Sequence, residues 1–201
     1  MSYKKVEEYC DDELERMAKN NKEILKLIGE DPDREGLAKT PVRVAKALQF
    51  MTQGYKMNAK KILDSARFKE SVSEMVIVKD IELYSMCEHH MLPFYGKIHI
   101  AYIPDGKVFG ISKLVRLVEK YSRRMQIQER LTKEIAGEIM EMGVKGVLVI
   151  IEGEHLCMKM RGVRNDSVIM TLAHRGVMEN KEIRENALVL LYDTKAKLRS
   201  V

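Results

Sequence analysis

The sequence predicts an α+β fold, in which an antiparallel sheet of order β-β-α-α-β-β carries its helices on one face and follows a helical N-terminal region. Apolar positions recur at helical spacing among dense charge over residues 5–28. After residue 73, segments rich in β-branched and aromatic residues come in pairs, and two amphipathic segments separate the pairs. Strands joined directly in pairs favour antiparallel hairpins, with the helices packed against the sheet.

The helical region begins with the helix over residues 5–28, which Gly29 closes. A second helix is expected from Thr40, as N-cap, to about Thr52, because Pro41 suits the first helical position. A short helical turn is expected over 58–64. We place the boundary of this region at residue 68, so that the sheet-containing domain comprises residues 69–201.

The elements of the second region follow from period and composition. We expect strands over 75–78, 81–84 and 95–103, then helices over 112–122 and 126–142, of which the second ends at Gly143. The apolar run 147–151 suits a buried strand, residues 156–173 are expected to form another strand, and residues 180–193 suit a last helix.

Composition limits the classes of function. The net charge of +5 comes from 35 basic and 30 acidic residues that are interspersed, so we expect no nucleic-acid partner. No stretch approaches the roughly 20 apolar residues of a membrane span. The N-terminal MSYKKVEEYCDDELERM lacks the apolar core of a signal peptide, which leads us to expect a cytoplasmic location. Three widely spaced cysteines do not suggest a disulfide framework.

The cysteines indicate a metal site. The segment S-M-C-E-H-H-M-L-P-F places Cys87 three residues before His90, with His89 between them, just after a predicted strand. His155 and Cys157 repeat the pairing of imidazole and thiol after the buried strand. Thiolate and imidazole are ligands that zinc prefers. Adjacent strands of one sheet could bring these two segments together.

Ligand number distinguishes two kinds of zinc site. A catalytic site uses three protein ligands and leaves a position for water, whereas a structural site closes all four. Cys87, Cys157 and one histidine make three good ligands, but residue chemistry alone does not say which histidine. The histidines left over suit proton transfer, and an activated water would be the nucleophile. A structural site with both histidines on the metal is the alternative.

Basic residues near predicted helix starts suggest an anion site. A helix N-terminus offers free N–H groups and partial positive charge to a phosphate. Each residue alone is an ordinary surface charge, but beside a zinc site the set suggests a polyphosphate: Ser112, Lys113, Arg116, Arg43, Lys46 and Arg161. The pair Gln128-Glu129 has no more than the pattern of an exposed helix.

Together these segments resemble the GTP cyclohydrolase I family. The resemblance covers nearly the whole chain from about Asp31, and it rests on five ordered motifs: D-P-x-R-E-G-L-x-x-T-P-x-R-V-A-K (31–46), S-M-C-E-H-H-x-x-P-F-x-G-K-x-H-I (85–100), G-x-S-K-L-x-R (110–116), Y-S-R-R-x-Q-x-Q-E-R-L-T (121–132) and H-x-C-M-x-x-R-G-V (155–163).

The resemblance implies the tunnelling fold, in a homodecamer built as a pentamer of dimers with active sites at subunit interfaces. It implies zinc-dependent hydrolysis of GTP at guanine C8, giving 7,8-dihydroneopterin triphosphate and formate, the first step of pterin and tetrahydrofolate synthesis. The implied metal ligands are Cys87, His90 and Cys157, and the implied acid–base residues are His89 and His155. The implied substrate contacts are Glu129 with Gln128 at the guanine, Ser112, Lys113, Arg116 and Arg161 near ribose and triphosphate, and Arg43 and Lys46 from a neighbouring subunit.

One stretch departs from the family, and two other functions remain open. RNDSVIMTLAHRGV (164–177) replaces a Ser/Thr-rich strand, in which Thr171 keeps one hydroxyl. An enzyme of the same fold acting on another pterin or a deazapurine is the first alternative; the nitrile reductase relative would need a nucleophilic cysteine and a nicotinamide cofactor. A non-catalytic assembly protein stabilised by zinc is the second.

Overall fold

The computed structural model describes residues 10–192. They form two compact units, of which the first ends at Gln53 and the second begins at Gly54. This division lies earlier than the boundary expected at residue 68, because α3 (Ala59–Asp64) packs against α4 (Ile111–Ser122) and β1 (Arg67–Lys69) pairs with β4 (Lys107–Phe109). Residues 54–68 thus belong to the unit that contains the sheet.

The first unit is a pair of helices, α1 (Asp11–Leu27) and α2 (Thr40–Met51). Both agree with the helices expected from periodicity, apart from residues 5–9, which lie outside the described residues. Three acidic side chains in the first turn of α1 suit the positive end of the helix dipole. The expectation that Thr40 is the N-cap is wrong by one residue, because Lys39 is the N-cap and Thr40 is already helical.

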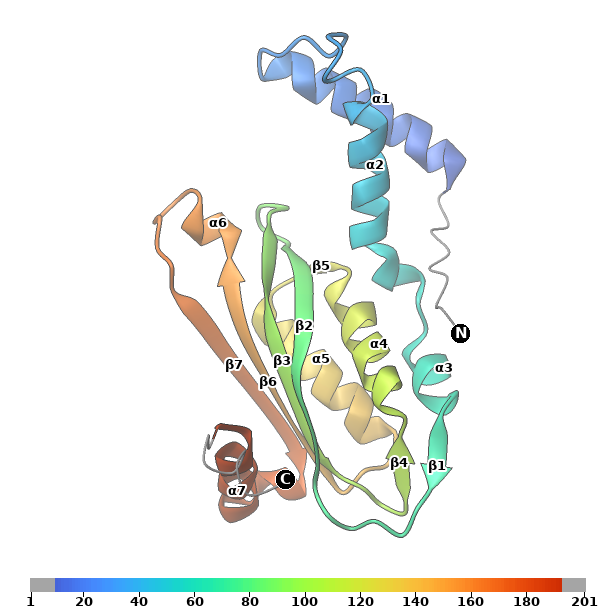
Figure 1. The fold of residues 1–201 in the computed structure, drawn as a ribbon, viewed down its shortest axis with the longest axis vertical. Coiled ribbons are helices and arrows are strands. Elements are labelled where there is room, and N and C mark those ends of the chain that lie inside the picture. The colour runs from blue at the N-terminus through green and yellow to red at the C-terminus, as the bar shows by residue number, and fades with distance from the viewer. Residues whose placement is uncertain (1–9, 193–201) are drawn as a thin grey trace. The chain divides into compact units, whose positions relative to one another are not determined.

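The second unit is built on a five-stranded sheet of order β5-β2-β3-β6-β7 (Figure 1). Its strands are β2 (Val76–Cys87), β3 (Pro93–Ile103), β5 (Met125–Gln126), β6 (Gly146–His155) and β7 (Val168–Gly176). All neighbours are antiparallel except the short β5, which runs parallel to β2. The predicted β-β-α-α-β-β order is therefore confirmed, and β1, β4 and β5 are additions to it.

Strand β2 joins two segments that the sequence suggested as separate strands. Its pairing with β3 shifts between Val78 and Ile81, and Asp80 there has φ = 57°. Such an irregularity is a β-bulge, in which an extra residue bends the strand without ending it. Polar Lys79-Asp80 in the middle of an apolar stretch is the sequence signal of this bulge.

Helices cover both faces of the sheet. The central helices α4 and α5 (Gln128–Glu141) cover one face, as predicted, and α7 (Lys181–Tyr192) packs on the other near one end of the sheet (Figure 1). The uninterrupted apolar run of β6 follows from this arrangement, since Val147, Val149 and Ile151 pack in the α4–α5 core while Leu148 and Ile150 pack under α7. Gly143, with φ = 79°, follows the end of α5.

The expectation that residues 156–173 form one strand is wrong. The chain first forms α6 (Leu156–Lys159), then a loop, and only then β7 from Val168. The remaining short elements are the 3₁₀ turns η1 (Gln53–Lys56) and η2 (Val177–Glu179). Among the described residues, no helix has the length and apolar character needed to cross a bilayer.

Candidate metal centre

Two strand ends carry the candidate metal ligands. Cys87 is the last residue of β2, His90 lies in the turn that follows, and Cys157 lies in α6 directly after β6. Both β2 and β6 pair antiparallel with β3, so they run in the same direction and their C-terminal ends lie at the same end of the sheet. The two strands are not adjacent, because β3 lies between them.

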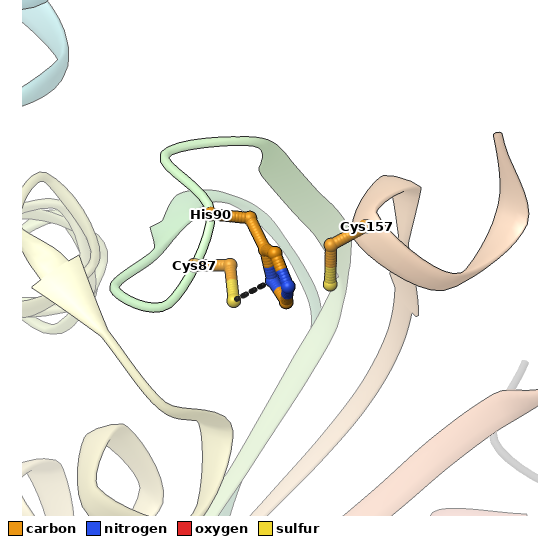
Figure 2. Close-up of side chains that lie close together, drawn as sticks. All are labelled: Cys87, His90 and Cys157. Atoms are coloured by element: carbon orange, nitrogen blue, oxygen red, sulfur yellow. Dashed lines mark hydrogen bonds between the residues drawn. The ribbon is translucent and has the colours of Figure 1, made fainter. Parts of the chain in front are cut away.

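The side chains of Cys87, His90 and Cys157 converge at this end of the sheet (Figure 2). The two cysteine sulfurs and one ring nitrogen of His90 all lie within 4.8 Å of one another. The Sγ atom of Cys87 is 3.8 Å from Nδ1 of His90. Both cysteines are buried and His90 is exposed, so the group opens to the outside on the histidine side. No other group of this kind occurs within residues 10–192.

The donor set fits a zinc ion. Both thiols are free rather than joined in a disulfide. Burial raises the pKa of Cys157, and the adjacent Cys87 raises that pKa further. Two buried thiols side by side resist ionising together, so a bound cation is what would hold both as thiolates. Two sulfurs and one imidazole make a three-ligand set of the catalytic type, which leaves a position open.

The backbone of the turn after β2 is held at both ends. The N–H of Cys87 donates to the carbonyl of Leu92 at 2.8 Å, and the N–H of Met91 donates to the carbonyl of Cys87 at 2.9 Å. Met91 has φ = 53°, a left-handed conformation that is uncommon for a residue with a side chain. The N–H of Glu88 donates to the carbonyl of Gln126 in β5 at 3.0 Å. These bonds give the turn one defined course around the ligands.

A pocket of about 350 Å³ adjoins the three ligands. Its lining includes the candidate acid–base and guanine-binding residues, namely His89, His155, Gln128 and Glu129. Nδ1 of His89 is 3.9 Å from Sγ of Cys87, and Glu129 is exposed on the first turn of α5. The pocket thus combines the group suited to a metal with further imidazoles and a carboxylate.

His155 is held in the pocket wall by two contacts. Its ring stacks on Phe94, with centroids 4.5 Å apart and planes 2° from parallel. Its Nε2 atom lies 2.9 Å from Oε1 of Gln128. Burial lowers the pKa of His155, opposed by the charge of Glu129. Neither Phe94 nor the contact between His155 and Gln128 was expected from the sequence, although Phe94 is the last residue of the segment S-M-C-E-H-H-M-L-P-F.

The expected phosphate-binding residues do not all gather at this pocket. Ser112, Lys113 and Arg116 lie in the first turns of α4, which begins beside β4 at the end of the sheet away from Cys87 (Figure 1). Arg43 and Lys46 are exposed on α2 in the first unit. Arg161 is exposed in the loop after α6, where its charge acts to lower the pKa of Cys157.

Comparison with known proteins gives the family of this chain. The sequence model of the family "GTP cyclohydrolase I" matches residues 17–192. GTP cyclohydrolase 1 of Campylobacter lari is 50% identical over 184 residues, covering 90% of this chain and 97% of the relative. GTP cyclohydrolase 1 of Chlorobium chlorochromatii is 57% identical, and the match covers 77% of this chain and 70% of the relative. GTP cyclohydrolase 1 of Chromohalobacter salexigens is 50% identical, and the match covers 89% of this chain and 98% of the relative.

A solved structure described as an archaeosine synthase QueF-Like protein in the apo form aligns with 53% of this chain at 19% identity and a TM-score of 0.45. The family model and the relatives cover most of the chain, including the converging cysteines and His90. The chain belongs to the GTP cyclohydrolase I family.

Proposed function

We propose that this chain, which has the tunnelling fold of its family, hydrolyses GTP at guanine C8 to 7,8-dihydroneopterin triphosphate and formate, as GTP cyclohydrolase I. The observation that carries the proposal is the convergence of Cys87, His90 and Cys157 in a pocket that also contains two further histidines and a carboxylate. This combination suits a hydrolysis that needs a metal and repeated proton transfers.

The family is zinc-dependent, and we assign Cys87, His90 and Cys157 as the residues that would hold the ion. A bound zinc ion would supply Lewis acidity and lower the pKa of water in the pocket. The protein supplies the sulfur donors from two buried positions and the nitrogen from an exposed one. His89 and His155 are then available for proton transfer.

His89 is assigned to donate a proton to guanine N7, and His155 to accept a proton as the C8 bonds are cleaved. Both side chains line the pocket, and neither belongs to the converging ligand group. Histidine suits both roles because its ordinary pKa lies near neutrality. Loss of C8 as formate and closure of the rearranged ribose onto the exposed amines require several such transfers.

Glu129 is assigned to the guanine edge. The N1–H and exocyclic amino groups of guanine are donors, and a carboxylate accepts from both. Glu129 lines the same pocket as the ligand group, and its side chain is exposed. Gln128 lines the same pocket and stays a predicted substrate residue.

The triphosphate site is proposed to need a second subunit. The helix α4 has 12 residues, which span about 18 Å, and its N-terminal Ser112, Lys113 and Arg116 lie at the end far from the pocket. The family is oligomeric. A neighbouring copy that brings these residues, or Arg43 and Lys46, to the pocket would complete the site with Arg161. We therefore propose active sites at subunit interfaces in a homodecamer, built as a pentamer of dimers.

We also propose that the protein acts in the cytoplasm. Its buried cysteines are free and are needed as thiolates, a state that a reducing compartment maintains. The expected partners are GTP and further copies of this chain, without nucleic acid or membrane.

Incubation with GTP tests the function. We expect formate release and, after oxidation, a fluorescent pterin. A strong zinc chelator should abolish both, and added zinc should restore them. An enzyme of the same fold with another substrate would give neither product from GTP. A protein that unfolds on chelation and never binds GTP would instead have a structural metal.

A further inference from the structure

The short strand β5 lies directly against the turn that carries His90. It pairs in parallel with the last two residues of β2, of which the second is the candidate ligand Cys87. Gln126 is the β5 residue opposite Cys87, and its backbone carbonyl accepts the N–H of Glu88 at 3.0 Å. The position of β5 therefore determines where the first residue of the turn is held.

The pairing with β2 does little to fix β5 in place. The strand has only two residues, and a parallel ladder is slightly less stable per residue than an antiparallel one. Such a short ladder would let β5 move with the turn and would not hold the turn still. A firm carbonyl at Gln126 needs a second attachment of β5 to the rest of the protein.

The side chain of Gln126 provides that attachment. Its Nε2 atom donates to the backbone carbonyl of Tyr121 at 3.0 Å and to the carboxylate of Glu134 at 2.8 Å. Its Oε1 atom accepts from Nε of Arg130 at 3.0 Å. Tyr121 lies in the last turn of α4, where carbonyls have no partner within the helix, and the other two residues lie on α5. The amide thus ties β5 to both central helices.

These contacts leave the amide of Gln126 only one orientation. A carbonyl and a carboxylate accept hydrogen bonds, whereas a guanidinium only donates them, so the NH₂ group faces Tyr121 and Glu134 and the oxygen faces Arg130. Gln126 is 1% exposed, so water does not replace a lost partner easily. Both amide hydrogens are already used, and neither is left for a ligand in the pocket that Gln126 helps to line.

We propose that Gln126 is a positioning residue for the metal centre. Its amide fixes β5 between α4 and α5, and β5 in turn holds the N–H of Glu88. The turn then keeps one course, so that the His90 nitrogen stays within reach of the two cysteine sulfurs. The effect on zinc rests on the donor set described above, and the effect on turnover rests on the proposed function.

Replacing Gln126 by methionine tests the proposal, because methionine keeps the length of the side chain and removes its three strong hydrogen bonds. We expect zinc affinity, measured by competition with a chelator, to fall about tenfold, the low end of the range for groups that orient metal ligands. In the metal-free protein, hydrogen exchange of the peptide that contains Glu88 should become roughly tenfold faster.

Tyr102→Phe is the control for general destabilisation. It removes a buried hydroxyl that accepts the N–H of Phe109 at 3.3 Å, near the end of β3 that lies away from the metal centre. This variant should leave zinc affinity and the exchange of the Glu88 peptide unchanged. A fall in zinc affinity equal to that of Gln126→Met would attribute the effect to lost stability and overturn the positioning role.

A pair of variants at Glu134 isolates the hydrogen bond itself. Glu134→Leu and Glu134→Gln both remove the charge, but only glutamine keeps an oxygen that can accept from Gln126. Zinc affinity should be lower in Glu134→Leu than in Glu134→Gln. If Gln126→Met does not fold, this comparison carries the test, and equal zinc affinities in the two variants would contradict the proposal.

Kinetics separate positioning from substrate contact. With excess zinc, Gln126→Met should regain most of its GTP turnover with an unchanged KM, because the residue acts through the metal turn. A raised KM with wild-type zinc affinity would make Gln126 a substrate contact instead. A wild-type protein that does not turn over GTP, but binds zinc more tightly than Gln126→Met, contradicts the proposed function and leaves the positioning role standing. An active wild-type enzyme whose Gln126→Met variant keeps both zinc affinity and the exchange rate overturns that role.

Discussion

Arg130 on α5 forms an ion pair with Glu88, the residue directly after the candidate ligand Cys87. Nε of Arg130 also donates to Oε1 of Gln126 at 3.0 Å, and Gln126 accepts the backbone N–H of Glu88 at its carbonyl. The hydrogen bond from Arg130 lowers the pKa of Glu88. Helix α5 thus braces the turn that carries His89 and His90.

Arg130→Ala should weaken metal retention more than it weakens the fold. The pair is partly exposed, so its loss should change the melting temperature little. Groups that orient metal ligands commonly change metal affinity about 10- to 100-fold, and we expect the low end of that range. Competition with a chromogenic chelator measures this. Arg34→Ala removes a comparable surface pair with Glu30 and should leave zinc affinity unchanged; equal affinities in both variants would contradict the bracing role.

Cys157→Ser should lose zinc. The substitution removes one of three converging donors, and a serine hydroxyl is a poor substitute for a thiolate. Elemental analysis of the purified protein should give a zinc content near zero, with no turnover of GTP. Cys10→Ser is the matched control, because Cys10 lies outside the ligand group. Zinc at the wild-type level in Cys157→Ser would remove this residue from the metal centre.

His89→Ala should keep zinc and lose activity. His89 lines the pocket, but His90 supplies the nitrogen of the ligand group. Loss of an acid–base residue costs on the order of 10²- to 10⁴-fold in kcat. His174→Ala, on β7 and outside the pocket lining, should retain turnover. Full activity in His89→Ala would exclude it from proton transfer, and loss of zinc would make it a ligand.

His99 should make stability depend on pH below neutrality. It is 5% exposed, and its Nδ1 accepts the N–H of Asp80 at 3.1 Å. Burial lowers the pKa of His99, with Asp80 and Glu152 opposing and Lys79 and Lys97 reinforcing the shift. The unfolded chain therefore takes up a proton first, near pH 6.5, so stability is full above that pH and falls as the pH drops.

The slope for one such group is at most about 1.4 kcal/mol per pH unit. His99→Asn keeps an acceptor for the N–H of Asp80 but does not titrate. Denaturant unfolding between pH 7.5 and 5.5, at one protein concentration, should show a shallower loss of stability for this variant. Parallel curves for the two proteins would show that His99 does not titrate differently in the folded and unfolded states.

The sequence alone determined the order of the main elements and the kind of chemistry. Helical periodicity identified the stretches that form α2, α4 and α5, and the paired apolar stretches identified β2, β3 and β6. These signals are local, since they depend on which face of each element is buried. The bulge at Asp80 joins two stretches that were expected to be separate strands, and the helix α6 with Cys157 forms where a strand was expected to begin. Local signals miss both features, because strand pairing and ligand geometry depend on residues far apart in the sequence.

In the metal centre, too, the sequence determined one part and the tertiary structure decided the rest. Residue types suggested two cysteines and one histidine, and resemblance to a family selected His90. Only the tertiary structure shows why His90 suits the role: β2 and β6 end together on either side of β3, so that its nitrogen meets both sulfurs, whereas Nε2 of His155 lies against Gln128. The brace from Arg130 could not be predicted, because it joins residues far apart in sequence through a contact that exists only once the sheet and α5 have packed.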